Sequence, residues 1–206
     1  TGYSALGSNT TGSWNTANGV KSLFSNTTGI RNVANGRNSL LSNTTGQKNT
    51  ATGDTSMQDN TTGNQNTANG TSSMAYNITG NYNTAMGVTS LYFNTTGSDN
   101  TAVGYASLYS TTASSGNTAL GNNAGNNNIN NGNNNTFIGY NAFADKAGFT
   151  NTTALGYGAM TTASNQVRIG NTNVNALYFG TANNLAVTTD SIPNMYYDYA
   201  TGQIMR

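Results

Sequence analysis

The sequence predicts an all-β protein, a parallel β-roll or solenoid built from stacked coils of 17 residues. Three observations carry this prediction. Two motifs return at a constant spacing, apolar residues recur at fixed places within the repeat, and residues that favour helices are scarce. A repeat of this kind decides the architecture, because each unit buries its apolar face only against its neighbours.

The first motif is the tetrapeptide Asn-Thr-Thr-Gly, and the second is Asn-Thr-Ala-x-Gly. Both return every 17 residues along the first 121 residues. The tetrapeptide starts at Asn9, Asn26, Asn43, Asn60 and Asn94, and its variant Asn-Ile-Thr-Gly starts at Asn77. The second motif starts at Asn15, Asn49, Asn66, Asn83, Asn100 and Asn117, and its variant Asn-Val-Ala-Asn-Gly starts at Asn32.

Aligning the repeats places small and apolar residues in constant columns, as a stacked core requires. A glycine column runs from Gly2 to Gly121 and marks a position that needs positive φ or a close approach of two backbones. One core column holds Leu6, Leu23, Leu40, Met57, Met74, Leu91 and Leu108. The other holds Ala17, Ala34, Ala51, Ala68, Ala85, Ala102 and Ala119.

The repeat is too short, and too rich in Gly, Asn and Thr, for the unit of a helical solenoid. We expect two short strands and two turns in each coil. The turns would lie at Asn-Thr-Thr-Gly and at the glycine of Asn-Thr-Ala-x-Gly, where Gly and Asn tolerate left-handed conformations. Coils stacked in register would lie about 4.8 Å apart, the spacing of neighbouring strands.

Three segments follow from the pattern. Residues 1–121 are the regular roll, residues 122–164 are irregular, Asn-rich coils of the same roll, and residues 165–206 are a C-terminal β connector. Strand-like alternation in the last segment predicts an interwoven β structure. It involves Val167, Ile169, Val174, Leu177, Phe179, Leu185 and Val187.

The composition excludes several kinds of function. Charged residues are 6% of the chain and the net charge is +1, so no basic surface points to nucleic acid. Without Cys or His, the chain contains no Ser-His-Asp or Cys-His arrangement and no metal site built on those ligands. No apolar run approaches the ~18 residues of a membrane span. We expect an extracellular protein with no metal, no cofactor, no nucleic-acid partner and no membrane insertion.

One row of Leu or Met and one row of Ala make a thin core for a single solenoid. A second buried face against other chains would supply the missing burial, so we expect a homotrimer. The candidate interface is a column that changes from polar to apolar along the chain: Asn18, Asn35, Thr52, Asn69, Met86, Val103 and Leu120.

These columns resemble the head repeats of trimeric autotransporter adhesins of the YadA type. That resemblance covers roughly residues 1–164 and implies a left-handed parallel β-roll in which three chains pack side by side. The family unit is a few residues shorter than the unit of this chain. Stretches nearer the family spacing are Asn135-Thr-Phe-Ile-Gly-Tyr-Asn-Ala-Phe and Thr153-Ala-Leu-Gly-Tyr-Gly-Ala-Met.

The C-terminal segment carries a second resemblance. Gln166-Val-Arg-Ile-Gly-Asn-Thr-Asn-Val and the last twelve residues, from Met195, look like the part of phage tail fibres that precedes an endosialidase-type intramolecular chaperone. In that family the chaperone trimerises the fibre and then cuts itself off. The resemblance implies that a chain ending at Arg206 is the mature product.

Aromatic residues in variable columns are the best ligand candidates, because exposed aromatic faces beside amide side chains suit sugars. An alternative is that they pack at the trimer interface, where aromatic residues also concentrate. The candidates are Trp14, Tyr76, Tyr82, Tyr92, Phe93, Tyr105 and Tyr109.

Catalysis is not expected. Glycan cleavage needs two carboxylates about 5–9.5 Å apart, and the columns that hold Asp54, Asp59 and Asp99 otherwise hold unrelated residues. The Asn-x-Thr sequons that recur with the first motif are interpreted as the turn of the coil rather than as glycosylation sites. The regular threonine column that begins at Thr16, interrupted by Val33, leaves an ice-binding solenoid as an alternative.

The sequence thus predicts a structural and adhesive segment of a trimeric phage tail fibre or similar appendage. It would present a surface that binds a host receptor, and we expect that receptor to be a glycan. A bacterial trimeric surface adhesin of the same architecture is the first alternative, and the ice-binding solenoid is the second.

Overall fold

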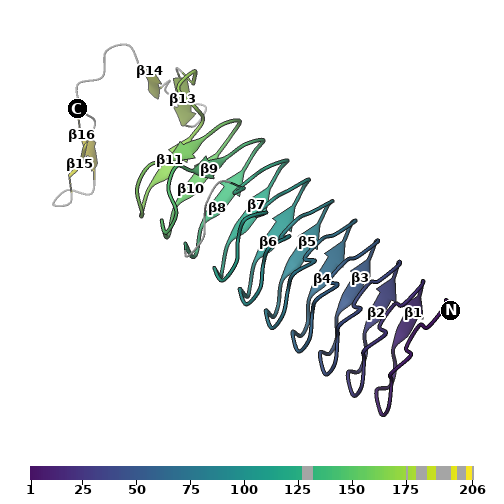
Figure 1. The fold of residues 1–206 in the computed structure, drawn as a ribbon. Helices are drawn as coiled ribbons and strands as arrows, with labels where there is room; N and C mark the ends of the chain where they lie inside the picture. Colours follow the sequence, from purple (N-terminus) through teal and green to yellow (C-terminus); the bar gives the residue numbers. More distant parts are fainter. Residues whose placement is uncertain (127–131, 175, 180–184, 189–195, 199–202, 206) are drawn as a thin grey trace.

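The computed structural model describes residues 1–126, 132–174, 176–179, 185–188, 196–198 and 203–205. The chain winds into a parallel β-solenoid whose coils follow one another from the N-terminus (Figure 1). Strand pairing joins Thr16 to Val33, Val33 to Thr50 and Thr50 to Thr67, so one regular coil takes 17 residues. The predicted all-β solenoid is therefore confirmed.

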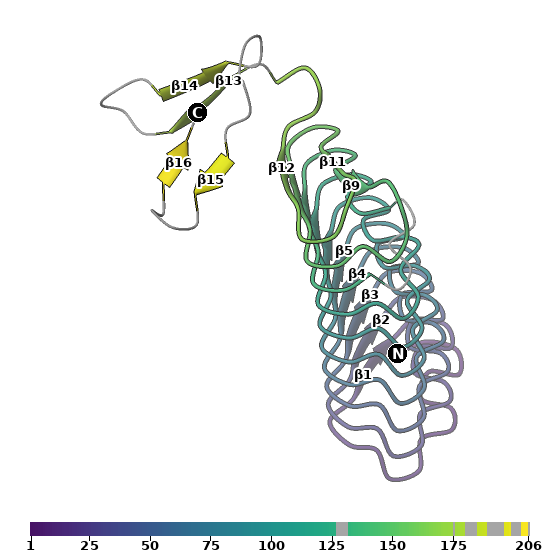
Figure 2. The ribbon, with the colours of Figure 1, turned by 90° about the vertical axis from the view of Figure 1, so that its left-hand side faces the viewer.

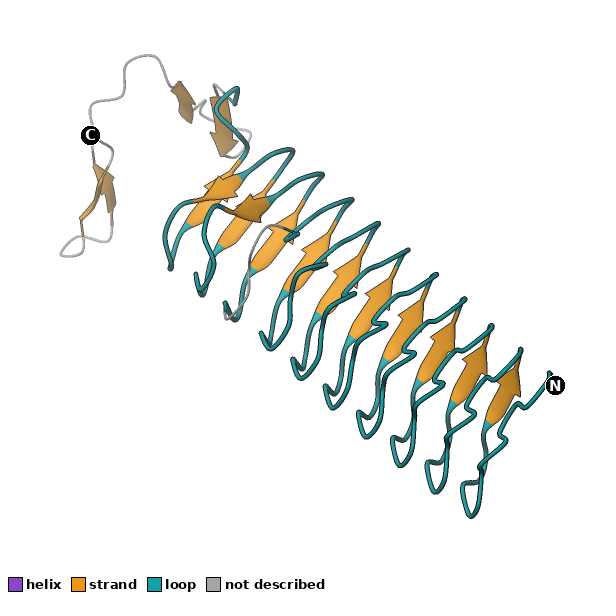
Figure 3. Ribbon diagram, in the orientation of Figure 1, coloured by secondary structure: helices purple, strands orange, loops and turns teal. Residues whose placement is uncertain are grey.

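One 10-stranded parallel sheet runs along the solenoid, in the order β1-β2-β3-β4-β5-β6-β7-β8-β10-β12 (Figure 3). Its strands are β1 (Thr16–Asn18), β2 (Val33–Asn35), β3 (Thr50–Thr52), β4 (Thr67–Asn69), β5 (Thr84–Met86), β6 (Thr101–Val103), β7 (Thr118–Leu120), β8 (Thr136–Ile138), β10 (Thr153–Leu155) and β12 (Val167–Ile169). Figure 2, turned by 90°, shows these strands lined up in a single row.

Three small pairs complete the described structure. β9 (Phe143–Ala144) and β11 (Met160–Thr161) pair in parallel. β13 (Ala176–Phe179) pairs with β14 (Leu185–Thr188), and β15 (Tyr196–Asp198) pairs with β16 (Gln203–Met205), both antiparallel. No helix occurs in the described ranges, so no helix there could cross a membrane.

The expectation of two strands in every coil is wrong for the regular coils, which have one strand of three residues. The rest of the coil turns too often to form a second strand. Lys21 and Leu23, separated by one residue, both adopt left-handed φ angles, of 54° and 49°. A second strand forms only where the Leu column loses this conformation, at Phe143 and Met160, which pair as β9 and β11.

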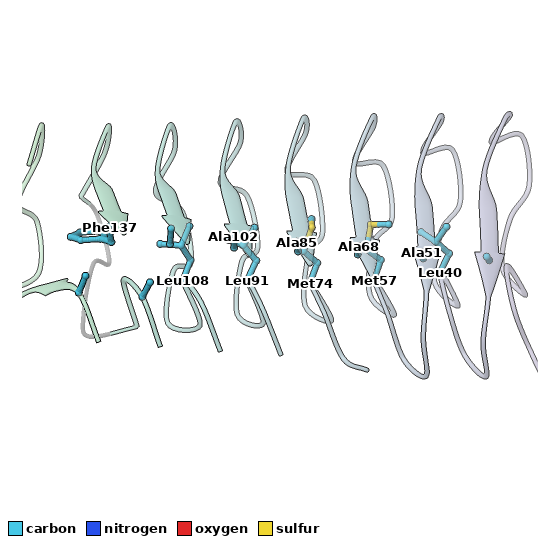
Figure 4. Close-up of a cluster of buried hydrophobic side chains, with 14 of the residues drawn as sticks. Leu40, Ala51, Met57, Ala68, Met74, Ala85, Leu91, Ala102, Leu108 and Phe137 are labelled. Atoms are coloured by element: carbon cyan, nitrogen blue, oxygen red, sulfur yellow. The ribbon is translucent and has the colours of Figure 1, made fainter. Parts of the chain in front are cut away.

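The predicted Leu/Met and Ala columns are confirmed as the apolar core (Figure 4). Leu40, Met57 and Leu91 are fully buried, and so are the alanines at the centre of each strand, such as Ala68. At the irregular coils the large side chain moves from the Leu/Met column to the Ala column. Gly125 follows Leu108 in one column, and a Cβ added to Gly125 would lie 2.8 Å from the ring of Phe137, which follows Ala119 in the other column.

Two ladders of buried asparagine, together with a column of buried serines that includes Ser39 and Ser56, fill the remainder of the interior. In the first ladder the Nδ2 of each Asn-Thr-Thr-Gly asparagine donates to the Oδ1 of the asparagine one coil earlier, at 2.6–2.8 Å. The same Nδ2 donates to the glycine carbonyl that closes its own turn, as Asn43 does to Gly46. The first motif is therefore a turn, as expected, but its asparagine belongs to the core.

The second ladder uses the asparagine that precedes each strand. Its Oδ1 accepts the backbone N–H of the equivalent residue one coil later, and its Nδ2 donates to a backbone carbonyl of the next turn. Asn49, for example, accepts from the N–H of Asn66 at 3.0 Å and donates to the carbonyl of Gly63 at 2.7 Å. Because these hydrogen bonds pair the buried amide groups, a single chain can complete the interior of its coils with polar side chains.

The glycine column shows both features expected from the sequence, a positive φ and a close approach of two backbones. Gly70 has a φ of +142°, and a Cβ there would lie 2.5 Å from the carbonyl oxygen of Gly87 in the next coil. The same overlap occurs along the column, so the corner after each strand can stack only without a side chain.

The C-terminal segment begins as part of the solenoid. β12 pairs with β10, so the main sheet extends past residue 164 into the stretch expected to be the connector. The described parts of residues 175–206 are the two antiparallel pairs, and the rest of the expected interwoven structure lies outside the described residues.

Candidate functional site

The aromatic residues predicted to bind a ligand lie in three different places. Four of them come together in one cluster: Tyr76, Tyr92, Phe93 and Tyr109. Trp14 and Tyr82 share a column on another turn, four coils apart, and do not meet. Tyr105 occupies a third column, the one that also holds the Arg37–Asp54 ion pair at 2.7 Å.

The cluster of Tyr76, Tyr92, Phe93 and Tyr109, called here the aromatic cluster, is closely packed. The Tyr92 and Tyr109 rings stack with centroids 5.2 Å apart, and Tyr76 and Phe93 stack at 5.5 Å. Edge-to-face contacts join the two stacks, with Tyr92 and Phe93 at 4.8 Å. Such aromatic pairs are worth about 0.5–1.5 kcal/mol beyond their buried area, so the rings hold one another in place.

The repeat explains why the cluster forms on one side of the rod. At the turn after the Leu column, equivalent residues of successive coils lie one above another. They are about 4.8 Å apart, which is a stacking distance for rings. In the first coils the column of Tyr92 and Tyr109 holds Phe24 and Leu41, whereas the column of Tyr76 and Phe93 holds two small residues, Ser25 and Ser42. Tyr76 and Phe93 replace them and remain 41% and 40% exposed.

The electrostatics of the cluster suit an uncharged ligand. A hydrogen bond with Tyr76 and then desolvation raise the pKa of Tyr92 above its usual value, and the charge of Asp59 contributes in the same direction. Tyr92 therefore stays a neutral hydroxyl, able to donate and accept, at any physiological pH. The adjacent negative charge of Asp59 disfavours an acidic ligand at this place.

The column of Trp14 forms a second edge of the rod. The residues of this column adopt left-handed φ angles of 56–59° from Trp14 to Asp99, and their side chains are exposed. The guanidinium of Arg31 lies 4.9 Å from the ring centroid of Trp14, a cation–π contact. Tyr82 is 57% exposed in the same column.

A depression of ≈ 360 Å³ lies on this second edge, across three successive coils. We call it the amide groove. It is lined by Gln47, Lys48, Asn64, Gln65, Asn81 and Tyr82. Of these, sequence reasoning selected only Tyr82, because the other five are ordinary surface residues when each coil is read alone. The available signal was that both columns are variable and adjacent, between two constant motifs.

The outer face of the main sheet carries two ranks of side chains. In each strand from β1 to β10 of this sheet the middle residue is buried and the two flanking residues face outward, whereas the middle residue of β12, Arg168, is half-buried. One rank is the threonine column from Thr16 to Thr153, with Val33 in it. The other rank begins with Asn18 and becomes apolar at Met86, continuing through Val103, Leu120, Ile138, Leu155 and Ile169.

The acidic residues of the described ranges do not gather into a further site. Asp54 is paired with Arg37, and Asp59 accepts a hydrogen bond from Gln58 at 3.4 Å. In the described ranges no group of three or more His, Cys, Asp or Glu could hold a metal ion.

The sequon asparagines from Asn26 to Asn94 are fully buried, and their Nδ2 atoms are hydrogen-bonded to the preceding asparagine. A glycan on that nitrogen would replace the ladder, so the folded coil has no room for one. Asn9, at the first coil, is half-buried and donates to the carbonyl of Gly12.

Comparisons of the chain with models of protein families, with curated proteins and with solved structures found no match. The fold and the surfaces described above therefore carry the functional argument alone.

Proposed function

We propose that this chain is a structural and adhesive segment of a trimeric extracellular fibre, such as a phage tail fibre, and that it binds glycans of a host surface. The observation that carries the proposal is the aromatic cluster. Four rings are held by mutual stacking, partly exposed, on a rod stiffened by hydrogen bonds between every pair of coils. Sugar rings stack their C–H faces on such platforms, while the tyrosine hydroxyls bond to sugar hydroxyls.

A glycan array of neutral oligosaccharides, followed by titration of the best binder, tests this proposal. The variant is Tyr76→Ser, Tyr92→Ala and Phe93→Ser together, which introduces residues found at the same columns in other coils, Ser42 and Ala75. Because those coils fold with the smaller residues, the fold should survive. We expect affinity to fall at least about tenfold, the loss of roughly 1.4 kcal/mol or more of stacking.

The matched control is Tyr140→Asn. Tyr140 stacks with Tyr157 at 5.7 Å in a different column, where Asn122 stands one coil earlier. Its loss should leave glycan binding unchanged. Equal binding by the triple variant and the wild type would exclude the cluster as the binding surface.

The trimer is the second part of the proposal. It is supported by the apolar rank on the outer face of the sheet, where Met86 is 44% exposed and Leu120 49% exposed. A stripe of this kind fits the face of an equivalent chain better than it fits water. Sedimentation of the protein should give a trimer, and Leu120→Asn with Leu155→Asn should weaken it. A stable folded monomer would contradict the trimer.

The same architecture would serve a bacterial trimeric surface adhesin. Neighbouring genes distinguish the two settings, since tail genes would indicate a phage fibre and a membrane anchor domain would indicate an adhesin. In either setting we propose binding without cleavage. A depolymerase assay on a bound polysaccharide should show no product.

A specific observation also favours ice binding as a second candidate. Thr50, Thr67, Thr84, Thr101 and Thr118 are paired in register on one outer face, at the regular spacing of strands. The neighbouring rank is mixed, however, and turns apolar from Met86 onward. A measurement of thermal hysteresis tests this candidate, and no hysteresis at high protein concentration would remove it.

A further inference from the structure

We infer that the amide groove is a separate saccharide subsite, built for an oligosaccharide that carries a carboxylate. The inference rests on the proposed function, because it assumes that the rod binds glycans. It concerns a different edge of the coil from the aromatic cluster and a different class of sugar.

The walls of the groove are fixed by backbone contacts. The Oδ1 of Asn64 accepts the N–H of Gln47 at 2.9 Å, and the Oδ1 of Asn81 accepts the N–H of Asn64 at 2.8 Å. The Nδ2 atoms of the same two asparagines donate to the carbonyls of Thr62 and Thr79. Asn64 and Asn81 therefore hold the shape of the groove and have little hydrogen-bonding capacity left for a ligand.

The remaining polar groups of the groove are free to bind. Within the described chain, the side chains of Gln47, Lys48 and Gln65 make no hydrogen bond, and the hydroxyl of Tyr82 makes none either. The two glutamines offer amide donors and acceptors, which match sugar hydroxyls. Tyr82, largely exposed, offers an aromatic face for a sugar ring.

The two ends of the groove differ in charge. Lys48 lies at one end, with Arg31 one coil before it, while Tyr82 lies at the other end, with Asp99 one coil after it. Lys48 has no ion-pair partner among the described residues. A carboxylate is therefore favoured beside Lys48 and disfavoured beyond Tyr82.

The length of the groove sets the size of the ligand. Lys48 and Tyr82 are two coils apart, or about 9.5 Å at the spacing of neighbouring strands. One pyranose ring does not span that distance. The ligand class is thus an oligosaccharide of at least two sugars, with a uronic or similar acidic sugar at Lys48 and a ring stacked on Tyr82.

The test uses the chain described here and two probes, a galacturonate oligosaccharide and its methyl ester, in which a methyl group replaces the charge of each carboxylate. The variants are Lys48→Gln and Tyr82→Gln. Both are compatible with the left-handed backbone, because Gln65 occupies the same column with a φ of 56°. The controls are Lys21→Gln, at another left-handed position with a φ of 54°, and Tyr140→Asn, which removes a tyrosine that is 48% exposed in a different column.

We expect the acid to bind the wild type about tenfold more tightly than the ester, as for one charge-assisted hydrogen bond. Lys48→Gln should abolish that preference and the salt dependence of binding, whereas Tyr82→Gln should weaken both probes. The two controls should behave as wild type. Equal binding of acid and ester by the wild type, or equal loss in Lys21→Gln, would overturn the inference.

Three further outcomes decide between this inference and the proposed function, or reject both. Binding of neutral glycans through the aromatic cluster, with no binding of the acidic probe, overturns the groove and leaves the proposed function standing. Equally tight binding of any polyanion, DNA included, would show a general charge effect and also overturn the saccharide subsite. No binding of any sugar would refute both.

Discussion

Asparagine side chains determine much of this protein at the scale of single residues. Each amide inside the first ladder bonds to the asparagines of both neighbouring coils and also closes its own turn. One residue therefore makes three hydrogen bonds, which its amide would make to water in the unfolded chain. Asn60 donates to the Oδ1 of Asn43 and to the carbonyl of Gly63, and accepts from Asn77. Buried polar groups of this kind contribute little when paired and cost much when one partner is removed.

Asn60→Ala should therefore destabilise the fold by about 3 kcal/mol, since it removes three hydrogen bonds at roughly 0.5–1.5 kcal/mol each and leaves the Oδ1 of Asn43 buried without a partner. The Gly63 carbonyl still accepts from Asn49, and the Nδ2 of Asn77 still donates to Gly80. Urea titration of the free energy of unfolding measures this. The control is Asn69→Ala in β4, an exposed asparagine whose loss should cost less than about 0.5 kcal/mol. Similar effects of the two substitutions would show that the ladder does not stabilise the protein.

The first ladder ends at a mismatch. Thr111 follows Asn94 in the column, and both Asn94 Oδ1 and Thr111 Oγ1 are buried without a hydrogen-bond partner in the described chain. Ser114 stands where the other turns have glycine, and at Gly80 a Cβ would lie 2.5 Å from the asparagine oxygen of its own turn. A longer side chain at residue 111 therefore needs a glycine at residue 114.

We expect Thr111→Asn alone to give no gain in stability, and Thr111→Asn with Ser114→Gly to gain about 1 kcal/mol by extending the ladder to Asn94. Ser114→Gly alone reports the loss of the serine's own contacts and the added chain flexibility. A double-mutant cycle on thermal unfolding isolates the coupling between the two positions. Additive effects would contradict the steric explanation.

The asparagine ladders also show where sequence reasoning stops. The Leu/Met, Ala and Gly columns could be assigned from the sequence, because apolar residues and glycine at a fixed period are typical of a stacked core. Asn43 was expected only as a turn residue and Asn49 was given no role of its own, since an asparagine in one isolated coil has no buried partner. The partner exists only after stacking, in the next copy of the same residue.

At the scale of the element, the coil is shaped by left-handed residues more than by strands. Leucine at a φ of about 50° is disfavoured on its own. It occurs here because the turn buries Leu23, and its counterparts, in the stack. No rule on turn sequences predicts a leucine there, which is why two strands were expected and one was found.

Gly70→Ala tests the stacking of the corner that follows each strand. An alanine there has a left-handed φ and a Cβ 2.5 Å from the oxygen of Gly87. Gly148→Ala is the matched control, because Gly148 also has a positive φ, of +82°, but nothing lies within 4 Å. Gly148→Ala should cost about 1–2 kcal/mol from backbone conformation alone. Gly70→Ala should cost clearly more, and equal losses of melting temperature would contradict the close packing.

At the scale of the whole molecule, surface and core follow different rules. The core columns repeat because every coil must match its neighbours, whereas the columns of Tyr76 and Tyr82 are free to vary. The sequence could therefore indicate which columns carry recognition. It could not show that Tyr76, Tyr92, Phe93 and Tyr109 meet, or that Lys48 and Tyr82 line one groove, because that depends on how each corner turns.

The stack also predicts how the chain tolerates changes of length. Deleting residues 53–69 joins Thr52 to Gly70, which then takes the place of Gly53 and restores every column. Such a chain loses one unit and one interface, so it should fold with a modestly lower melting temperature and the same circular dichroism per residue. Deleting residues 53–68 is the control. It shifts every later column by one position, turns the alanines of the strands outward and puts Asn69 at the glycine corner. We expect that shorter deletion to prevent cooperative unfolding altogether, and equal stability of the two deletions would refute the in-register stack.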